Sequence, residues 1–427
     1  MDHTSEYSPE ATEQIDEVPQ IDSKTGMYQV WMLATSLSIL QIGFGLIVPL
    51  YPFYILELGV GGTELGVLAA SFALTRIVLA GPLGGVSDRV GRKPVLQVAL
   101  LGFAVANLMY AFATTVYVMI LARALEGAIS AGFYPAANAF VSDMTTPENR
   151  GTAMGYLSTG NMVGFVFGPA LGGVLAEFLG IRMPFIIAAI VTLGTLVLLH
   201  LLVIEPTRRT LREDYQKYKI PLREVFSRHS KAYSVLGLAM FANMFAIGIL
   251  EVAFMLDAVQ RFAFSPLEIG IFFGVLGVIT IAGNIAFGKM SDRVGRKWLI
   301  VLGSFVGALS LFMFMLASDV FSFYLAGAVL GVAISMRGPT IQAMIADLTD
   351  QSAYGVVMGA FGAVSNSAYV VGPLLGGVLY DTSGDSISSL AVAGIVSIAG
   401  ATLAGIGLPA YTPSLLATPL DIQDSEE

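Results

Sequence analysis

The sequence predicts an all-helical membrane protein, with twelve transmembrane helices arranged as two pseudo-symmetric six-helix bundles. The first observation is composition: 55% of the residues are hydrophobic and 12% are charged, whereas a soluble domain carries about 25% charged residues. The second is that apolar runs of about 20 residues recur, each long enough to cross a bilayer as a helix. The third is a charged phrase that occurs twice, as GGVSDRVGRK at 84–93 and as GKMSDRVGRK at 288–297.

The apolar runs are predicted to be helices because a helix satisfies its own backbone hydrogen bonds in lipid. The predicted spans are 30–56, 65–86, 94–114, 116–142, 152–176, 183–204, 232–256, 267–289, 298–317, 320–345, 354–380 and 388–409. A long basic connection at 205–231 separates an N-terminal bundle at 30–204 from a C-terminal bundle at 232–409. The acidic ends, 1–29 and 410–427, are predicted to be disordered tails.

The two halves repeat in constant register beyond the charged phrase. At the same offset of 204 residues, paired glycines, prolines and aspartates recur. They include Gly127 with Gly331, Pro135 with Pro339, Asp143 with Asp347, and Gly168-Pro169 with Gly372-Pro373. Halves with an even number of helices and the same topology are parallel repeats, related by an axis along the membrane normal.

The basic residues predict the orientation in the membrane. With the N-terminus in the cytoplasm, 17 of the 22 lysines and arginines lie on the cytoplasmic side. Only Arg182 and Arg261 fall outside, and Arg76, Arg123 and Arg337 fall within spans. This distribution follows the positive-inside rule. We therefore expect a multi-pass protein of the cell membrane with both termini cytoplasmic.

Several classes of function are disfavoured by what the sequence lacks. There is no cysteine, and the three histidines are scattered, so no thiolate or histidine cluster is available for a metal. No HExxH, GxSxG or P-loop pattern occurs. We expect no enzyme, no cofactor and no nucleic-acid partner, and we expect a monomer.

Four motifs carry a resemblance to a known family. They are GPLGGVSDRVGRK at 81–93, Pro49-Leu50-Tyr51-Pro52, Arg123-Ala124-Leu125-Glu126-Gly127, and a glycine series at 160–173. On these residues the chain resembles a major facilitator superfamily transporter over roughly 30–409, and within it the twelve-helix drug:proton antiporters. The resemblance implies proton-coupled efflux of small amphipathic or drug-like molecules by alternating access. Many drug antiporters carry a carboxylate in the first helix, and this chain has none there.

Charged side chains inside the spans are the main candidates for proton coupling or substrate binding, because each is costly to bury unpaired. They are Arg123, Glu126, Glu251, Arg337 and Arg76. Arg123 and Glu126 are three residues apart and share a helix face, so they can pair. Glu126 is then either a proton carrier whose partner is Arg123, or one half of a static ion pair. Glu251 falls in the outer third of its span, where an interfacial position is almost as plausible as a cavity position.

The duplicated loop is predicted to act as a cytoplasmic latch. The aspartates of each loop are placed to accept hydrogen bonds from backbone nitrogens at a helix end. Arg92 is placed to pair with Asp143 at the inner end of the fourth span, and Arg296 is its counterpart for Asp347. The alternative is that both loops are only tight turns and topology anchors. The residues concerned are Gly84, Asp88, Arg89, Gly91, Arg92, Asp143, Gly288, Asp292, Arg293, Gly295, Arg296 and Asp347.

The glycine series lies in the fifth span and resembles the antiporter motif of the family. It comprises Gly160, Gly164, Gly168, Pro169, Gly172 and Gly173. The four-residue spacing places glycines on one helix face, and the proline favours a kink. We expect this face to pack closely against the other half, and the resemblance adds the role of limiting leakage of substrate. Ordinary helix packing is the simpler alternative.

Polar and aromatic residues on or near the first, fourth, seventh and tenth spans are cavity candidates, because those helices line the central cavity in the family. They are Gln41, Phe44, Tyr134, Asn138, Asn161, Phe241 and Asn243. Each of them alone is as easily a packing or interhelical hydrogen-bonding residue.

Two other functions remain open from the sequence. One is a transporter of an organic anion or metabolite held by the intramembrane arginines. The other is a transporter-like sensor that does not transport. The charge preference of the substrate, and the effect of neutralising each arginine, would separate these from a drug antiporter.

Overall fold

The computed structural model describes residues 23–205, 226–227, 229–349 and 353–410. Within that part of the chain every regular element is helical, and twelve helices are long and apolar enough to cross a membrane. The predicted fold class is confirmed. The predictions for the two tails, and for most of the central connection, lie outside the described residues.

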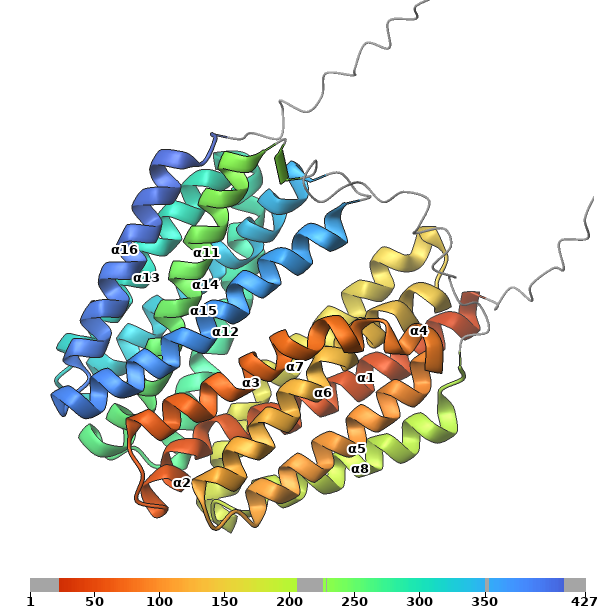
Figure 1. Ribbon diagram of the computed structural model, residues 1–427, viewed down its shortest axis with the longest axis horizontal. Helices are drawn as coiled ribbons and strands as arrows, with labels where there is room; N and C mark the ends of the chain where they lie inside the picture. The colour runs from red at the N-terminus through yellow and green to blue at the C-terminus, as the bar shows by residue number, and fades with distance from the viewer. Residues whose placement is uncertain (1–22, 206–225, 228, 350–352, 411–427) are drawn as a thin grey trace, which may run out of the picture.

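The N-terminal bundle contains the first six spans (Figure 1). The first span is α1 (Ser23–Ile47), which continues through the short 3-10 helix η1 (Val48–Leu50) into α2 (Tyr51–Glu57). The others are α3 (Gly62–Gly84), α5 (Arg92–Ala111), α6 (Val116–Met144), α7 (Pro147–Leu179) and α8 (Met183–Leu202), with the short α4 (Val86–Val90) in the loop motif.

The C-terminal bundle repeats this order. Its first span is α11 (Ser230–Leu256), which ends in the π-helix η2 (Asp257–Arg261). It is followed by α12 (Pro266–Val294), α13 (Arg296–Leu316), α14 (Val320–Leu348), α15 (Tyr354–Ser383) and α16 (Ile387–Gly407).

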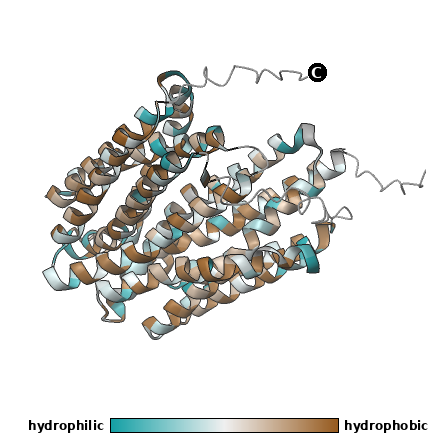
Figure 2. Cartoon of the chain, turned by 45° about the horizontal axis from the view of Figure 1, so that its top comes forward, coloured by the Kyte–Doolittle hydropathy of each residue, from teal (hydrophilic) through white to brown (hydrophobic). Residues whose placement is uncertain are grey.

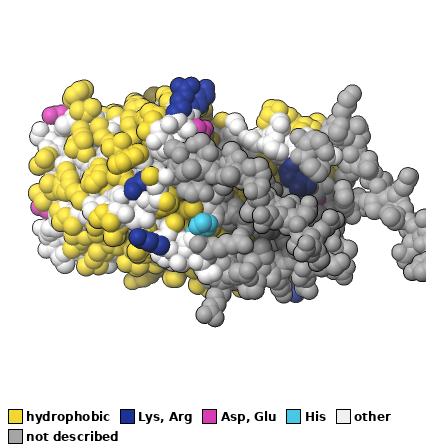
Figure 3. Space-filling model, turned by 90° about the horizontal axis from the view of Figure 1, so that it is seen from above, with side chains coloured by type: hydrophobic (Ala, Val, Ile, Leu, Met, Phe, Trp, Pro, Cys, Tyr) yellow, Lys and Arg dark blue, Asp and Glu magenta, His cyan; other side chains and the backbone are white. Residues whose placement is uncertain are grey.

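The outer surface of the helices is apolar (Figure 2). Large hydrophobic side chains such as Phe112, Phe178, Phe321 and Ile406 are exposed along it. An exposed apolar surface of this extent is unfavourable in water but matches the hydrocarbon of a bilayer. Seen from the end where the loop motifs lie, lysines and arginines reach the surface at several separate places (Figure 3).

At the end away from the loop motifs, the two bundles touch backbone to backbone. A Cβ atom added to Gly173 of α7 would lie 2.3 Å from the carbonyl oxygen of Pro266 in α12. One added to Gly377 of α15 would lie 2.2 Å from the carbonyl oxygen of Gly62 in α3. Only glycine allows this approach, so four helices seal this end of the interface.

The same helix faces are uncovered at the loop-motif end. Gly155 on α7 and Gly359 on α15 each lie eighteen residues, five helical turns, before the glycine that makes the seal. A Cβ atom at either position would meet nothing within 4 Å. The structure is therefore closed at one end and open at the end that carries the loop motifs, as the splayed bundles in Figure 1 also show.

Candidate functional site

A buried ion pair lies inside the N-terminal bundle on α6. Arg123 and Glu126 are 4% and 0% exposed, and 3.1 Å separates Arg123 Nη1 from Glu126 Oε2. Both side chains are on one face because they are three residues apart in a helix. Gly127 lets α6 approach the backbone of α3, since a Cβ there would lie 2.2 Å from Phe72 O. This close packing brings Phe72 of α3 next to the pair.

Three aromatic rings surround the guanidinium of Arg123. Its Cζ lies 5.0 Å from the ring centre of Phe44, 4.8 Å from that of Phe72 and 5.3 Å from that of Tyr51. A cation over an aromatic face is stabilised by about 0.5–2 kcal/mol, and most when it is desolvated. Phe44, a cavity candidate from the sequence, therefore contacts the charge of Arg123.

Glu126 is also bound by a tyrosine. The hydroxyl of Tyr110 on α5 donates to Glu126 Oε2 at 3.0 Å, and the hydroxyl of Tyr51 lies 3.4 Å from that of Tyr110. Oε2 thus accepts from both Arg123 and Tyr110. The second oxygen, Oε1, is buried and has no hydrogen-bond partner among the described residues.

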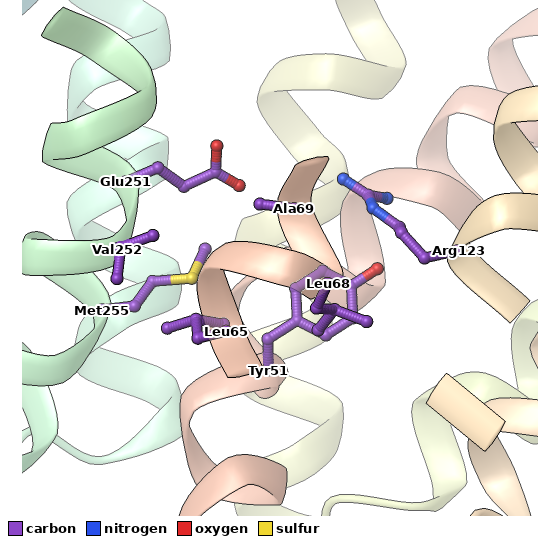
Figure 4. Close-up of a pocket in the computed structure, with 8 residues that line it drawn as sticks. All are labelled: Tyr51, Leu65, Leu68, Ala69, Arg123, Glu251, Val252 and Met255. Carbon is purple, nitrogen blue, oxygen red and sulfur yellow. The ribbon is translucent and has the colours of Figure 1, made fainter. Parts of the chain in front are cut away.

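A small pocket adjoins this cluster at the interface of the two bundles (Figure 4). Glu251 on α11 faces it from the C-terminal bundle, and Tyr51 and Arg123 face it from the N-terminal bundle. The remaining lining is apolar and consists of Leu65, Leu68, Ala69, Val252 and Met255. Its cavity volume of about 10 Å³ is close to the space needed by one water molecule. Glu251 therefore lines a pocket between the bundles rather than lying at the membrane–water interface.

Other polar candidates form a second group in the N-terminal bundle. The guanidinium of Arg76 lies over the ring of Tyr134, 5.5 Å from its centre. The hydroxyl of Tyr134 donates to Gln41 Oε1 at 2.9 Å, which links α6 to α1. Asn138 is exposed on α6, and Asn161 is half-buried on α7.

Arg337 lies inside the C-terminal bundle, separate from the pocket. It is buried on α14 and donates to Asn243 Oδ1 of α11 at 2.7 Å. Asn243 in turn donates to Ser304 Oγ of α13 at 3.1 Å. A Cβ atom at Gly307 would lie 2.7 Å from Arg337 Nη1, so that glycine makes room for the guanidinium. Phe241 stacks on Phe245 within α11.

The loop motif builds one charged cluster in each bundle. In the first, Arg92 donates to Asp143 at 3.0 Å, to Ser87 at 2.8 Å and to Asp88. Gly91, which precedes α5, has a φ of 114°, a conformation that requires glycine. The cluster joins α4, the start of α5 and the end of α6.

The second cluster repeats this arrangement. Arg296 donates to Asp347, to Asp292 at 3.0 Å and to Ser291 at 3.2 Å, after Gly295 with a φ of 95°. Arg89 and Arg293 are exposed, and a Cβ atom at Gly288 would meet nothing within 4 Å. Gly84 ends α3.

The prediction that the glycine face of α7 packs against the other bundle was wrong. Cβ atoms at Gly160, Gly164, Gly168 and Gly172 would collide with α1 of the same bundle, at 2.1–2.7 Å. Pro169 lies on that contact too, against Gly45. Of the five glycines, Gly173 is the one that meets the other bundle, because one further residue turns the side-chain position by about 100° around the helix. The carbonyl oxygen of Pro169 also faces α12, since a Cβ atom at Gly270 would lie 3.0 Å from it. Sequence spacing identified the face but not the helix that packs on it.

Comparison with known proteins agrees with this architecture. The family model described as Major Facilitator Superfamily matches residues 33–242 and 236–418. The chain belongs to the major facilitator superfamily. It is thus a multi-pass membrane transporter.

Named relatives within the superfamily are drug-resistance proteins of bacteria. The chain is 28% identical to "Multidrug resistance protein 2" of Bacillus subtilis over 356 residues, covering 82% of this chain and 88% of that protein. It is 30% identical to "Tetracycline resistance protein, class H" of Pasteurella multocida over 351 residues, covering 80% and 86%. Among solved structures, an inward-facing bacterial homologue of the human lysosomal transporter Spinster superposes with a TM-score of 0.77 at 16% identity, covering 90% of this chain and 97% of that one.

Two features of this superfamily member were not predicted from its sequence. One is Tyr110, whose partner Glu126 lies on the next helix. The other is Glu205, which follows α8 and accepts from the backbone nitrogens of Arg92 and Lys93 at 2.7 and 2.8 Å. The signal that could have identified it is a carboxylate directly after one span, on the same side of the membrane as the N-terminus of another helix.

The closed end also carries a carboxylate in each bundle that binds the other bundle. Asp381 of α15 accepts from the backbone nitrogens of Gly62 and Thr63, each at 2.7 Å. Glu177 of α7 accepts from the nitrogen of Leu267 at 3.5 Å. Each acid caps the N-terminus of the second helix of the opposite bundle, where the helix dipole favours an anion.

Proposed function

We propose that this protein exports small amphipathic or drug-like molecules by proton-coupled antiport, with Glu126 as a proton carrier. The observation that carries the proposal is the environment of Glu126. It is fully buried, one oxygen is held by Arg123 and Tyr110, and the other has no partner in the described structure. A buried carboxyl of this kind is neutralised either by its arginine or by a proton.

The pocket supports coupling between proton binding and movement of the bundles. Arg123 and Glu251 belong to different bundles yet line the same pocket. Relative rotation of the bundles changes the distance between these opposite charges, and therefore the balance between Arg123 and a proton at Glu126. A change in bundle position and a change in protonation are thereby linked.

Alternating access is supported by the interface itself. One end is sealed by glycine contacts, and the same helix faces are uncovered at the other end. Rocking of one bundle against the other is the usual way in which parallel repeats alternate. Relatives named for multidrug and tetracycline resistance support a drug-like substrate.

The decisive experiment measures proton movement in proteoliposomes that contain an interior pH dye. Wild type, Glu126→Gln and Glu251→Gln are tested against a panel of cationic, neutral and anionic compounds. We expect at least one compound to drive proton flux in wild type and not in Glu126→Gln. Undiminished flux in Glu126→Gln would show that its pair with Arg123 is structural and would move the carrier role to Glu251.

Export of an organic anion is the second candidate. It is favoured by Arg337, which is buried in the C-terminal bundle and donates to the neutral amide of Asn243. The same panel decides between the two, because an anion carrier responds only to the anionic compounds. In that case Arg337→Gln should abolish the response.

The absence of cysteine makes alternating access directly measurable. Gly155→Cys and Gly359→Cys lie on the open faces, so each should react rapidly with a membrane-impermeant maleimide added from the loop-motif side. Substrate or a proton gradient should change the reaction rate at both positions in parallel. Rates that never respond at either position would argue against rocking.

A further inference from the structure

We propose that Tyr51 and Tyr110 form a proton relay between the interfacial pocket and Glu126. The inference rests on the proposed role of Glu126 as proton carrier. It adds the route by which a proton reaches a carboxyl that has no exposed surface.

The geometry provides a continuous chain of hydroxyl groups. Tyr51 lines the pocket, its hydroxyl donates to that of Tyr110 at 3.4 Å, and Tyr110 donates to Glu126 Oε2 at 3.0 Å. The first link is longer than the usual O–H···O distance of about 2.8 Å. Both tyrosines belong to the N-terminal bundle, and Tyr51 is the one that faces the C-terminal bundle across the pocket.

Transfer along the chain conserves protons at each step. Water in the pocket, in exchange with Glu251, gives a proton to the hydroxyl oxygen of Tyr51. Tyr51 passes its own hydroxyl proton to the oxygen of Tyr110, and Tyr110 passes its own to Glu126 Oε2. Glu126 is then the neutral acid, the pocket water or Glu251 has lost one proton, and both tyrosines are again neutral. After Glu126 has released the proton, rotation of the two hydroxyl groups restores the starting hydrogen bonds.

The size of the pocket suits this use. Its volume is that of about one water molecule, and the lining other than its charged and hydroxyl groups is apolar. The pocket thus admits a water molecule, which can carry a proton, and excludes an amphipathic molecule. The charged groups that face the relay are Arg123 and Glu126 from α6 and Glu251 from α11.

The C-terminal bundle shows what packing alone requires at these positions. Gly248 contacts Pro373 as Gly45 contacts Pro169, so residues of α11 correspond to those of α1 and α2 at an offset of 203. Phe254 then corresponds to Tyr51, and Phe314 corresponds to Tyr110 at the general offset of 204.

The aromatic pair is conserved between the bundles, but the hydroxyls are not. The Phe254 and Phe314 ring centres are 6.1 Å apart, and those of Tyr51 and Tyr110 are 5.8 Å apart. The position of Glu126 is occupied by Leu330 in the second bundle. Hydroxyl groups are thus present in the bundle that has the carboxylate and missing where it is replaced, which is the pattern expected of a relay rather than of packing.

The test compares Tyr110→Phe and Tyr51→Phe with Tyr54→Phe in the proteoliposome assay. Tyr54 is a matched control, because it is a buried tyrosine one turn from Tyr51 whose hydroxyl lies 3.4 Å from the carbonyl of Ala111. Two rates are measured: substrate-driven proton flux, and exchange of labelled for unlabelled substrate, which moves no net proton. We expect proton flux to fall at least about tenfold in both relay variants, with exchange unchanged. Tyr54→Phe should keep both rates.

The outcomes separate failure of the relay from failure of proton coupling. If Tyr110→Phe and Tyr51→Phe keep the wild-type flux while Glu126→Gln has lost it, the relay is wrong and the carrier role stands. If both relay variants lose exchange together with flux, the hydroxyls act in packing or binding and the relay is again wrong. If Glu126→Gln keeps its flux, the proposed function fails and the relay fails with it.

Discussion

The N-terminal bundle buries an ion pair at Arg123 and Glu126, whereas the C-terminal bundle has glycine and leucine at the corresponding positions, Gly327 and Leu330. The latter bundle fills that region with rings: a Cβ atom at Gly327 would lie 2.2 Å from the ring of Phe272. The backbone contacts are nevertheless shared. Gly172 approaches Leu46 in one bundle much as Gly376 approaches Ile249 in the other.

The difference shows which parts of the duplicated unit are tied to movement and which to chemistry. The loop clusters, the intrabundle glycine contacts and the interbundle seal occur in both halves. The buried carboxylate with its hydroxyl chain occurs in one half, and the buried Arg337 in the other. Under the proposed mechanism, two rocking bundles need equal mechanical parts, while a coupling site is needed only once.

The largest effect is expected from breaking the ion pair on one side only. Arg123→Leu leaves a buried carboxylate without its guanidinium, and removing one partner of a buried pair costs about 3–5 kcal/mol. The double variant Arg123→Leu/Glu126→Leu removes both charges and should recover most of that loss. Thermal unfolding in detergent measures both. A double variant less stable than Arg123→Leu would mean that the N-terminal bundle depends on the charges for its fold.

A smaller effect is expected from filling the seal. Gly173→Val and Gly377→Val place side chains against the backbone of the opposite bundle and should destabilise the closed end by about 1–3 kcal/mol. The matched controls are Gly155→Val and Gly359→Val, which lie five turns away in open space. Labelling of a single cysteine at the closed end reports the change. The two bundles should respond alike, and a strong asymmetry would contradict equal mechanical roles.

The smallest effect is expected from the carboxylate caps. Asp381→Ala removes two hydrogen bonds of 2.7 Å, and Glu177→Ala removes one of 3.5 Å. Loss of a helix cap costs about 0.5–2 kcal/mol, so the first variant should open the sealed end more than the second. The same cysteine labelling ranks the two. An equal effect of both variants would show that hydrogen-bond geometry does not set the strength of the seal.

The fold could be predicted from the sequence because its signals are local or repeated. Apolar runs of spanning length define the helices, and the repeated phrase defines the duplication. The structure extends one predicted span: Asp257, one residue beyond the predicted end of the seventh span, is buried in the π-helix η2 and accepts from Ser386.

The candidate site was predictable only in part, because its contacts are between helices. The Arg123–Glu126 pair follows from spacing within one helix. The contribution of Tyr110 does not, since a tyrosine near the end of a span is typical of a membrane interface. The partner of the glycine face on α7 was wrong for a similar reason, because helical periodicity defines a face but leaves its neighbour undefined.

The seal at the closed end has a consequence for how such a transporter changes over generations. It is made by backbone atoms of glycine-bearing helices and by two caps on helix ends, so it asks little of the side chains that line the cavity. Substitutions of the side chains that line the cavity can alter which molecules are carried without weakening the barrier to leakage. A broad or shifting range of cargo is therefore compatible with a constant closing mechanism.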